Sequence, residues 1–214
     1  MAPERGFPLF PLEIVALPTE DVPLHIFEER YRTMIGECLE NESEFGIVWA
    51  EADSVGDAAG VHTIGCAMRI AQVLERDDEG RLNISCVGTR PFAVIEMTDA
   101  EPYPAGVIEF LADEPEETDP ELVSEAHDAY RAIVELATGR DPDPSELEGL
   151  SAYEMAAKID FGPAAKQGLL GLRSESGRLR LFTQLTRALI KRLELADAAR
   201  ERARVNGKVR FDWR

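Results

Sequence analysis

The side chains that could carry out metal or phosphate chemistry are few and widely spaced. The three histidines, His25, His62 and His127, never occur at the i, i+3 or i, i+4 spacing that places two metal ligands on one face of a helix. Residues 60–65 have the glycine spacing of a phosphate-binding loop, but Cys-Ala follows where such a loop needs Lys and then Ser or Thr. We therefore expect no metal site, no nucleotide-hydrolysing site and no cofactor.

Nucleophilic catalysis has equally little support in the sequence. There is no Gly-x-Ser-x-Gly turn, and Ser85 falls inside an expected strand. The cysteines Cys38, Cys66 and Cys86 are odd in number and lack the close spacing of a disulfide framework or a zinc knuckle, so we expect them to be reduced and buried. Carboxylate runs such as 77–79 are typical of solvated loops. We expect no catalytic residue and no enzymatic activity.

Charge is unevenly distributed along the 214 residues, whose net charge is −18. Residues 1–165 contain 36 acidic and 10 basic residues (net −26), whereas residues 166–214 contain 5 and 13 (net +8). The acidic part should repel nucleic acid, while the basic end could contact RNA, a membrane or an acidic partner. Mutual attraction or solvation of the two parts is the simpler interpretation. Without a long apolar run or a secretion signal, a cytoplasmic protein is expected.

The first half should be rich in strands, with one inserted helix. Residues 7–17 are apolar but include Pro8 and Pro11, which predicts an edge strand or an extended entry because proline donates no hydrogen bond to a sheet. Between residues 28 and 41 the apolar residues have helical spacing. Further strands are expected at residues 45–50, 64–74, 81–87, 92–97 and 106–111, with a hairpin turn at 77–80.

An acidic stretch containing two prolines, residues 113–120, marks a change from strands to helices. We therefore divide the chain into a β-rich part, residues 1–115, and a helical part, residues 116–214. Strands followed by helices indicate the α+β class.

Local signals mark where the later helices begin and end. Asp119 and Pro120 form a typical helix start, and Gly139 a typical end. Ser151 and Glu154 have the spacing of a capping box. A short helix is expected after residue 162, and a long one from residue 174 to about residue 204.

Two apolar stretches near the amino terminus are candidates for binding another polypeptide. The prolines should leave backbone groups of the first stretch unpaired, and an edge of this kind can accept an extended peptide. Burial of the same side chains in the core is the alternative. The candidate contact residues are Phe7, Leu9, Phe10, Leu24, Ile26 and Phe27.

Several segments resemble the amino-terminal domain of the Lon ATP-dependent protease family in sequence, order and spacing. These segments are residues 7–12 (FPLFPL), 22–31 (VPLHIFEERY), 45–48 (FGIV), 65–70 (GCAMRI), 81–92 (RLNISCVGTRPF) and 166–170 (KQGLL). Residues 16–21 depart from the family, which usually has a turn of the Phe-Pro-Gly type there.

The resemblance implies a PUA-like β-barrel with one inserted helix, followed by a small helical bundle that ends in a long helix. It implies a non-catalytic, substrate-recognising module whose partners are unfolded or exposed apolar polypeptide segments, with a protease or chaperone as a further candidate. No phosphate-loop lysine or Ser-Lys protease dyad is recognisable, so we expect a domain that acts without ATPase and protease parts. RNA binding through the basic last helix is the alternative, because PUA-like barrels include RNA-binding members.

Overall fold

Six strands form a single mixed sheet that closes on itself. The structure is a computed structural model that describes residues 3–51, 61–98 and 102–206. The strands lie in the order β2-β5-β4-β3-β1-β6, and β5 also pairs with β6. Their bounds are β1 Glu4–Leu12, β2 Asp21–Ile26, β3 Phe45–Ala50, β4 Val61–Arg76, β5 Leu82–Thr98 and β6 Ala105–Phe110.

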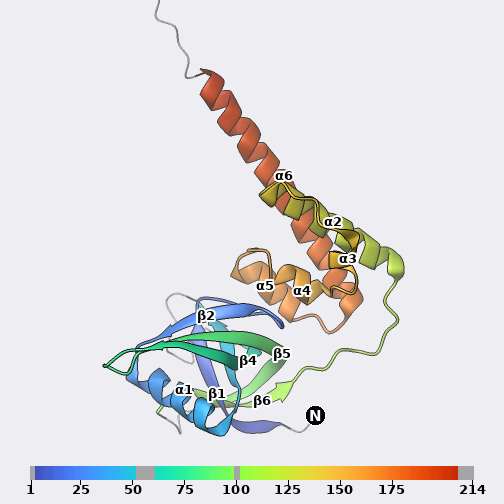
Figure 1. Cartoon of the computed structure of the whole chain (residues 1–214). Coiled ribbons are helices and arrows are strands. Elements are labelled where there is room, and N and C mark those ends of the chain that lie inside the picture. Colours follow the sequence, from blue (N-terminus) through green and yellow to red (C-terminus); the bar gives the residue numbers. More distant parts are fainter. Residues whose placement is uncertain (1–2, 52–60, 99–101, 207–214) are drawn as a thin grey trace, which may run out of the picture.

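The helices follow the sheet in sequence, except for one that is inserted after β2. Their bounds are α1 Glu29–Asn41, α2 Pro120–Thr138, α3 Pro144–Leu147, α4 Ala152–Ala156, α5 Pro163–Leu170 and α6 Glu175–Asn206. In Figure 1 the later helices lie together on one side of the sheet, and the far half of α6 projects away from it. The predicted α+β class, with a helical part that ends in a long helix, matches this arrangement.

Strand β1 lies inside the sheet, so the prediction of an edge strand is wrong. It pairs with β3 in parallel and with β6 in antiparallel orientation. The prolines are tolerated because the residues around them still form backbone hydrogen bonds. The N–H of Leu9, for example, donates to the carbonyl of Pro104 at 2.8 Å. Closure of the sheet supplies a neighbour on both sides of β1, which the sequence pattern does not reveal.

Strand β5 is continuous where two strands were expected, and its neighbour changes along its length. Residues 82–87 pair with β2, and residues 92–98 pair with β6. The change occurs at Gly88, whose N–H donates to Glu20 and whose carbonyl accepts from Thr19, at 2.9 and 2.8 Å. A Cβ at Gly88 would lie 2.0 Å from the carbonyl oxygen of Leu17, in the loop between β1 and β2, so glycine is needed for this close approach.

The closed part of the sheet encloses a small apolar core. Strands β1 and β5 are not paired, yet the rings of Phe7 and Phe92 lie 5.5 Å apart, which places both inside the closed strands. Gly46 and Gly65 leave room for the Phe92 ring, because a Cβ at either position would lie less than 3 Å from it. This core consists of Phe7, Leu9, Val48, Ala67, Phe92, Ile108 and Phe110.

A larger core joins the other face of the sheet to α1 and to the helical part. It includes Phe10, Met34, Phe45, Met155 and Phe182, which come from two strands and three helices. Burial on this scale fixes the helices against the sheet. The expected division near residue 115 falls in the linker between β6 and α2, and it stays a prediction.

The predicted helix signals are confirmed. Asp119 accepts a hydrogen bond from the Glu121 N–H at 2.9 Å, and Gly139 ends α2 in the left-handed conformation with φ 70°. Ser151 and Glu154 form the capping box of α4. The single turn α3 was not predicted. No helix in the described part of the chain is long and apolar enough to cross a membrane.

Candidate functional site

The six candidate contact residues divide into a buried and an accessible group. At most 6% of the surface is exposed for Phe7, Leu9, Phe10 and Ile26. Leu24 is half-buried, and Phe27 is 59% exposed. The prediction that the first four contact a partner is corrected, because their side chains pack in the core. Leu24 and Phe27 remain candidates.

Phe27 directly follows β2 and is exposed because it continues the alternation of that strand. Side chains of successive strand residues point to opposite faces, and Ile26 points into the core. Phe27 therefore points outward, where its ring stacks against His25 with the ring centroids 5.8 Å apart and the planes at 25°.

Three strand segments next to Phe27 form what we call the three-stranded lobe. They are β2, residues 69–76 of β4 and residues 82–87 of β5. Strand β3 pairs with β4 only as far as Met68, so among the described residues this part of β4 pairs with β5 alone. A hollow of about 710 Å³ opens on the lobe. It is lined by Pro23, Leu24, His25, Leu74, Glu75, Asn83 and Ile84.

A β-bulge places Leu74 at the edge of this hollow. Val73 pairs with Ile84 and Glu75 with Asn83, so Leu74 is the extra residue without a partner across the ladder. Its side chain is 55% exposed, and that of Val73 is 37% exposed. Together with Phe27, the bulge concentrates accessible apolar surface at one end of the sheet.

Sequence reasoning missed Leu74 and Val73. Two adjacent apolar residues close to a hairpin turn carry a usable signal, because alternation sends one of them to the solvent side. The identity of that residue depends on the bulge, which the pairing of β4 with β5 determines.

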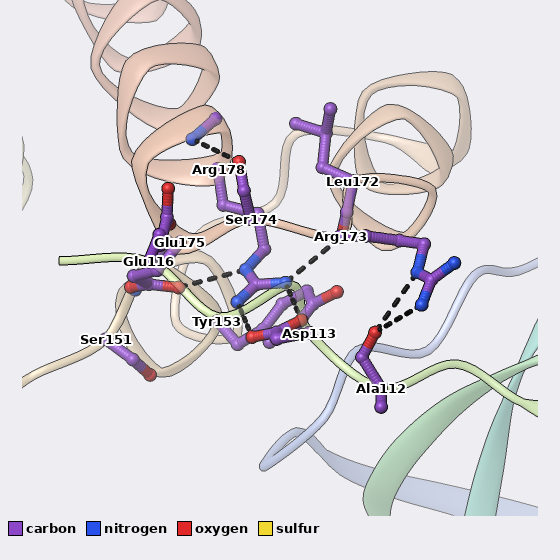
Figure 2. A network of polar contacts seen from close by, with 12 residues as sticks. Ala112, Asp113, Glu116, Ser151, Tyr153, Leu172, Arg173, Ser174, Glu175 and Arg178 are labelled. Carbon is purple, nitrogen blue, oxygen red and sulfur yellow. Dashed lines mark hydrogen bonds and ion pairs between the residues drawn. The ribbon is translucent and has the colours of Figure 1, made fainter. Parts of the chain in front are cut away.

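A buried arginine fixes the helical part relative to the sheet (Figure 2). Arg178 of α6 is 2% exposed; its Nη1 donates to Asp113 at 2.7 Å and to the Leu172 carbonyl at 3.0 Å. Its Nε donates to Glu175 at 2.9 Å, and the guanidinium lies 4.5 Å from the Tyr153 ring centroid. The group is therefore surrounded by neighbours from the linker, α4, the α5–α6 loop and α6.

The same region binds the linker at several further points. Arg173 donates to the carbonyl of Ala112 at 2.9 and 3.1 Å, and its own carbonyl accepts from the Glu114 N–H at 2.8 Å. The N–H of Ser176 donates to Glu116 at 2.8 Å. The linker is thus attached to the start of α6 along most of its acidic stretch.

The electrostatics of this cluster are those of a structural ion pair. Burial acts against the charge of Arg178, but its hydrogen bonds to the carboxylates of Asp113 and Glu175 keep its pKa above the usual value. The hydrogen bond from Arg178 lowers the pKa of Asp113. Burial raises the pKa of Tyr153 to about 12. At neutral pH the arginine and Asp113 are charged and the tyrosine is neutral.

The cysteines are free and buried, as predicted. Burial raises the pKa of Cys86 to about 12, and it also raises the pKa of Cys38 and Cys66. Because the thiolate is the nucleophilic form, we expect these thiols to react slowly at neutral pH. Within residues 3–51, 61–98 and 102–206, no three His, Cys, Asp or Glu side chains are grouped so that they could hold a metal ion.

Comparison with known proteins connects this fold to one family. The family model of the substrate-binding domain of ATP-dependent protease La (LON) matches residues 6–188. The chain belongs to the LON substrate-binding domain family. The Lon protease of Flavobacterium johnsoniae is 22% identical over 220 residues, which cover 97% of this chain and 26% of that protein. The chain therefore spans about a quarter of the length of this relative.

Solved structures confirm the LON-domain fold. The crystal structure of a Lon N-terminal domain protein from Xanthomonas campestris superposes with a TM-score of 0.60 at 23% identity, covering 83% of this chain and 96% of the other. The N-terminal domain of the Mycobacterium avium complex Lon protease superposes with a TM-score of 0.61 at 20% identity, covering 85% and 98%. The resemblance noted in the sequence is thus confirmed over most of the chain.

Proposed function

We propose that this LON domain is a non-catalytic module that binds exposed apolar segments of other polypeptides at the three-stranded lobe. The family model is described as a substrate-binding domain of an ATP-dependent protease, which supports a role in recognition. The proposal keeps Leu24 and Phe27 as contacts and adds Val73 and Leu74 from β4.

The observation that carries the proposal is the grouping of accessible apolar side chains in and beside one hollow. Phe27 is 59% and Leu74 is 55% exposed, and Leu24 and Leu74 both line the hollow. Complete burial of one such side chain contributes about 2 kcal/mol. Two or three partly exposed side chains can therefore supply the affinity of a weak, reversible contact with an unfolded chain, without requiring one particular sequence.

Titration of a labelled, permanently unfolded polypeptide with this protein tests the proposal by fluorescence anisotropy. Binding should persist at high salt, because apolar contacts are not screened. We expect Leu74→Asp to weaken binding about tenfold, since it removes one apolar contact and adds an acidic group. Leu195→Asp is the matched control, because Leu195 on α6 is 58% exposed and lies outside the lobe. Equal binding by both variants would reject the lobe as the site.

RNA binding is the competing function, and one observation favours it: residues 166–214, which include α6, have a net charge of +8. Contacts with phosphate groups would make the affinity fall steeply as salt increases. The same titration with a single-stranded RNA separates the two functions, and salt-sensitive binding of RNA alone would replace the proposal made here.

A further inference from the structure

A row of three polar side chains crosses the hollow. His25 lies directly opposite Asn83, and Asn83 lies directly opposite Glu75, so the register places all three on the same face of the three-stranded lobe. His25 Nδ1 and Asn83 Oδ1 are 2.7 Å apart. Asn83 Nδ2 donates to Glu75 Oε2 at 2.9 Å. The row connects β2, β5 and β4 through their side chains.

The hydrogen bonds fix how these groups are oriented. Because the amide nitrogen of Asn83 donates to Glu75, its amide oxygen faces His25, and an amide oxygen can only accept. His25 Nδ1 therefore carries the hydrogen of this contact. The Glu75 carboxylate is held at one oxygen by Asn83 and lines the hollow beside Leu74. An oriented carboxylate next to an exposed apolar side chain can recognise two neighbouring groups of a ligand.

The charges near the hollow favour a cationic ligand. Acidic residues lie at both ends of β2 and in the hairpin turn: Asp21, Glu28, Glu29, Asp77, Asp78 and Glu79. Arginines also lie in this region: Arg30 pairs with Glu28, Arg81 pairs with Asp77 and Glu79, Arg32 donates to the Glu79 carbonyl, and Arg76 ends β4 next to Glu75, so the acidic groups still outnumber the basic ones. In the described part of the chain, no lysine or arginine forms an ion pair with Glu75.

We propose that the hollow binds an extended polypeptide segment in which an apolar residue is adjacent to a lysine or arginine. The apolar side chain packs against Leu74, and the cation pairs with Glu75. This inference rests on the proposed function, because it names the kind of segment that the same surface selects. A segment with an acidic residue at that position is disfavoured by repulsion from Glu75.

Three short unfolded peptides with one shared apolar core test this inference. They differ only in the residue beside the core, which is Lys, Gln or Glu. We expect affinity to decrease in that order, with about a threefold difference between Lys and Gln, as for an exposed ion pair. Glu75→Gln removes the charge but can still accept from Asn83, so it should abolish the preference for Lys. Asp78→Asn removes a charge in the nearby turn, outside the hollow, and should preserve the preference.

The outcomes separate the two proposals. If all three peptides bind equally well, or if Glu75→Gln and Asp78→Asn reduce the preference equally, the pairing with Glu75 is overturned while apolar binding stands. If none of the peptides binds, the proposed function itself fails. Thermal unfolding of both variants verifies the fold, which we expect to be unaffected because both side chains are exposed.

Discussion

The two ends of β5 belong to one strand but have different surroundings. After Gly88, β5 lies between β4 and β6, and all its neighbours belong to the closed sheet. Before Gly88, it lies between β2 and the end of β4, and neither pairs with a further strand among the described residues. The closed end buries Phe92 but leaves Ile95 56% exposed, and the open end buries Leu82 and Ile84 but exposes Leu74 and Phe27. At each end an apolar side chain is exposed at the extra residue of a β-bulge, Ile95 in the closed end and Leu74 in the open end, so local register as well as closure decides whether it is buried.

The closed end should account for most of the stability. Phe92 is completely buried and contacts Phe7 across the enclosed core. We expect Phe92→Ala to lower the free energy of unfolding by about 4 kcal/mol, because it leaves a cavity between strands that cannot collapse. Urea denaturation followed by circular dichroism measures this. If Phe92→Ala lowers the free energy of unfolding no more than substitution of an exposed residue does, the comparison is contradicted.

Gly88 is where the two ends meet, and substitution there should affect the open end. A Cβ at Gly88 would overlap the carbonyl oxygen of Leu17, so Gly88→Ala should displace the loop that leads into β2. We expect a loss of about 2 kcal/mol, with faster amide exchange in β2. Gly36→Ala is the control, because no atom lies within 4 Å of its added Cβ and alanine favours the α1 helix. Unchanged exchange in β2 would show that the loop does not hold the strand.

Two leucines on either side of the hairpin turn sharpen the comparison within the open end. Leu82 is 2% exposed and Leu74 is 55% exposed. We expect Leu82→Ala to cost about 2 kcal/mol of stability and Leu74→Ala less than about 0.5 kcal/mol. Binding of the unfolded polypeptide should respond in the opposite way, weakening for Leu74→Ala. Equal stability losses would mean that the bulge residue is part of the core.

The smallest effect concerns the order in which two cysteines react. Cys86 pairs with Val22 of the open end, and Cys66 pairs with Pro91 beside the closed end. Burial raises the pKa of both thiols, so both should alkylate slowly, and faster as the pH rises and more thiolate forms. Local opening of the edge strand β2 should let Cys86 react first. Mass spectrometry after iodoacetamide treatment measures the order, and earlier modification of Cys66 would contradict it.

Features that depend on nearby residues could be predicted from the sequence. The cap at Asp119, the stop at Gly139 and the capping box at Ser151 involve groups within a few residues of one another. The strand at residues 45–50 was predicted with the bounds that the structure gives. In each case the physical cause is local, namely a cap, a glycine conformation or an apolar run.

Features that depend on pairing could not be predicted in the same way. The interior position of β1 follows from closure through β6, which is distant in sequence. The exposure of Leu74 follows from the register of β4 against β5. Arg178 and Asp113 are separated by 65 positions, and nothing near either residue indicates its partner. The candidate site was consequently predicted only in part, through Leu24 and Phe27.

The attachment of the linker to α6 also has a mechanical consequence. Helix α6 has 32 residues, a length of about 48 Å at the usual rise per residue, and its far half projects from the body (Figure 1). A force on the projecting end is therefore transmitted along the helix to its near half, which packs against α2 and carries Arg178. Because the bonds from Arg173 and Arg178 hold Ala112 and Asp113 just after β6, tilting the helix pulls on the sheet itself.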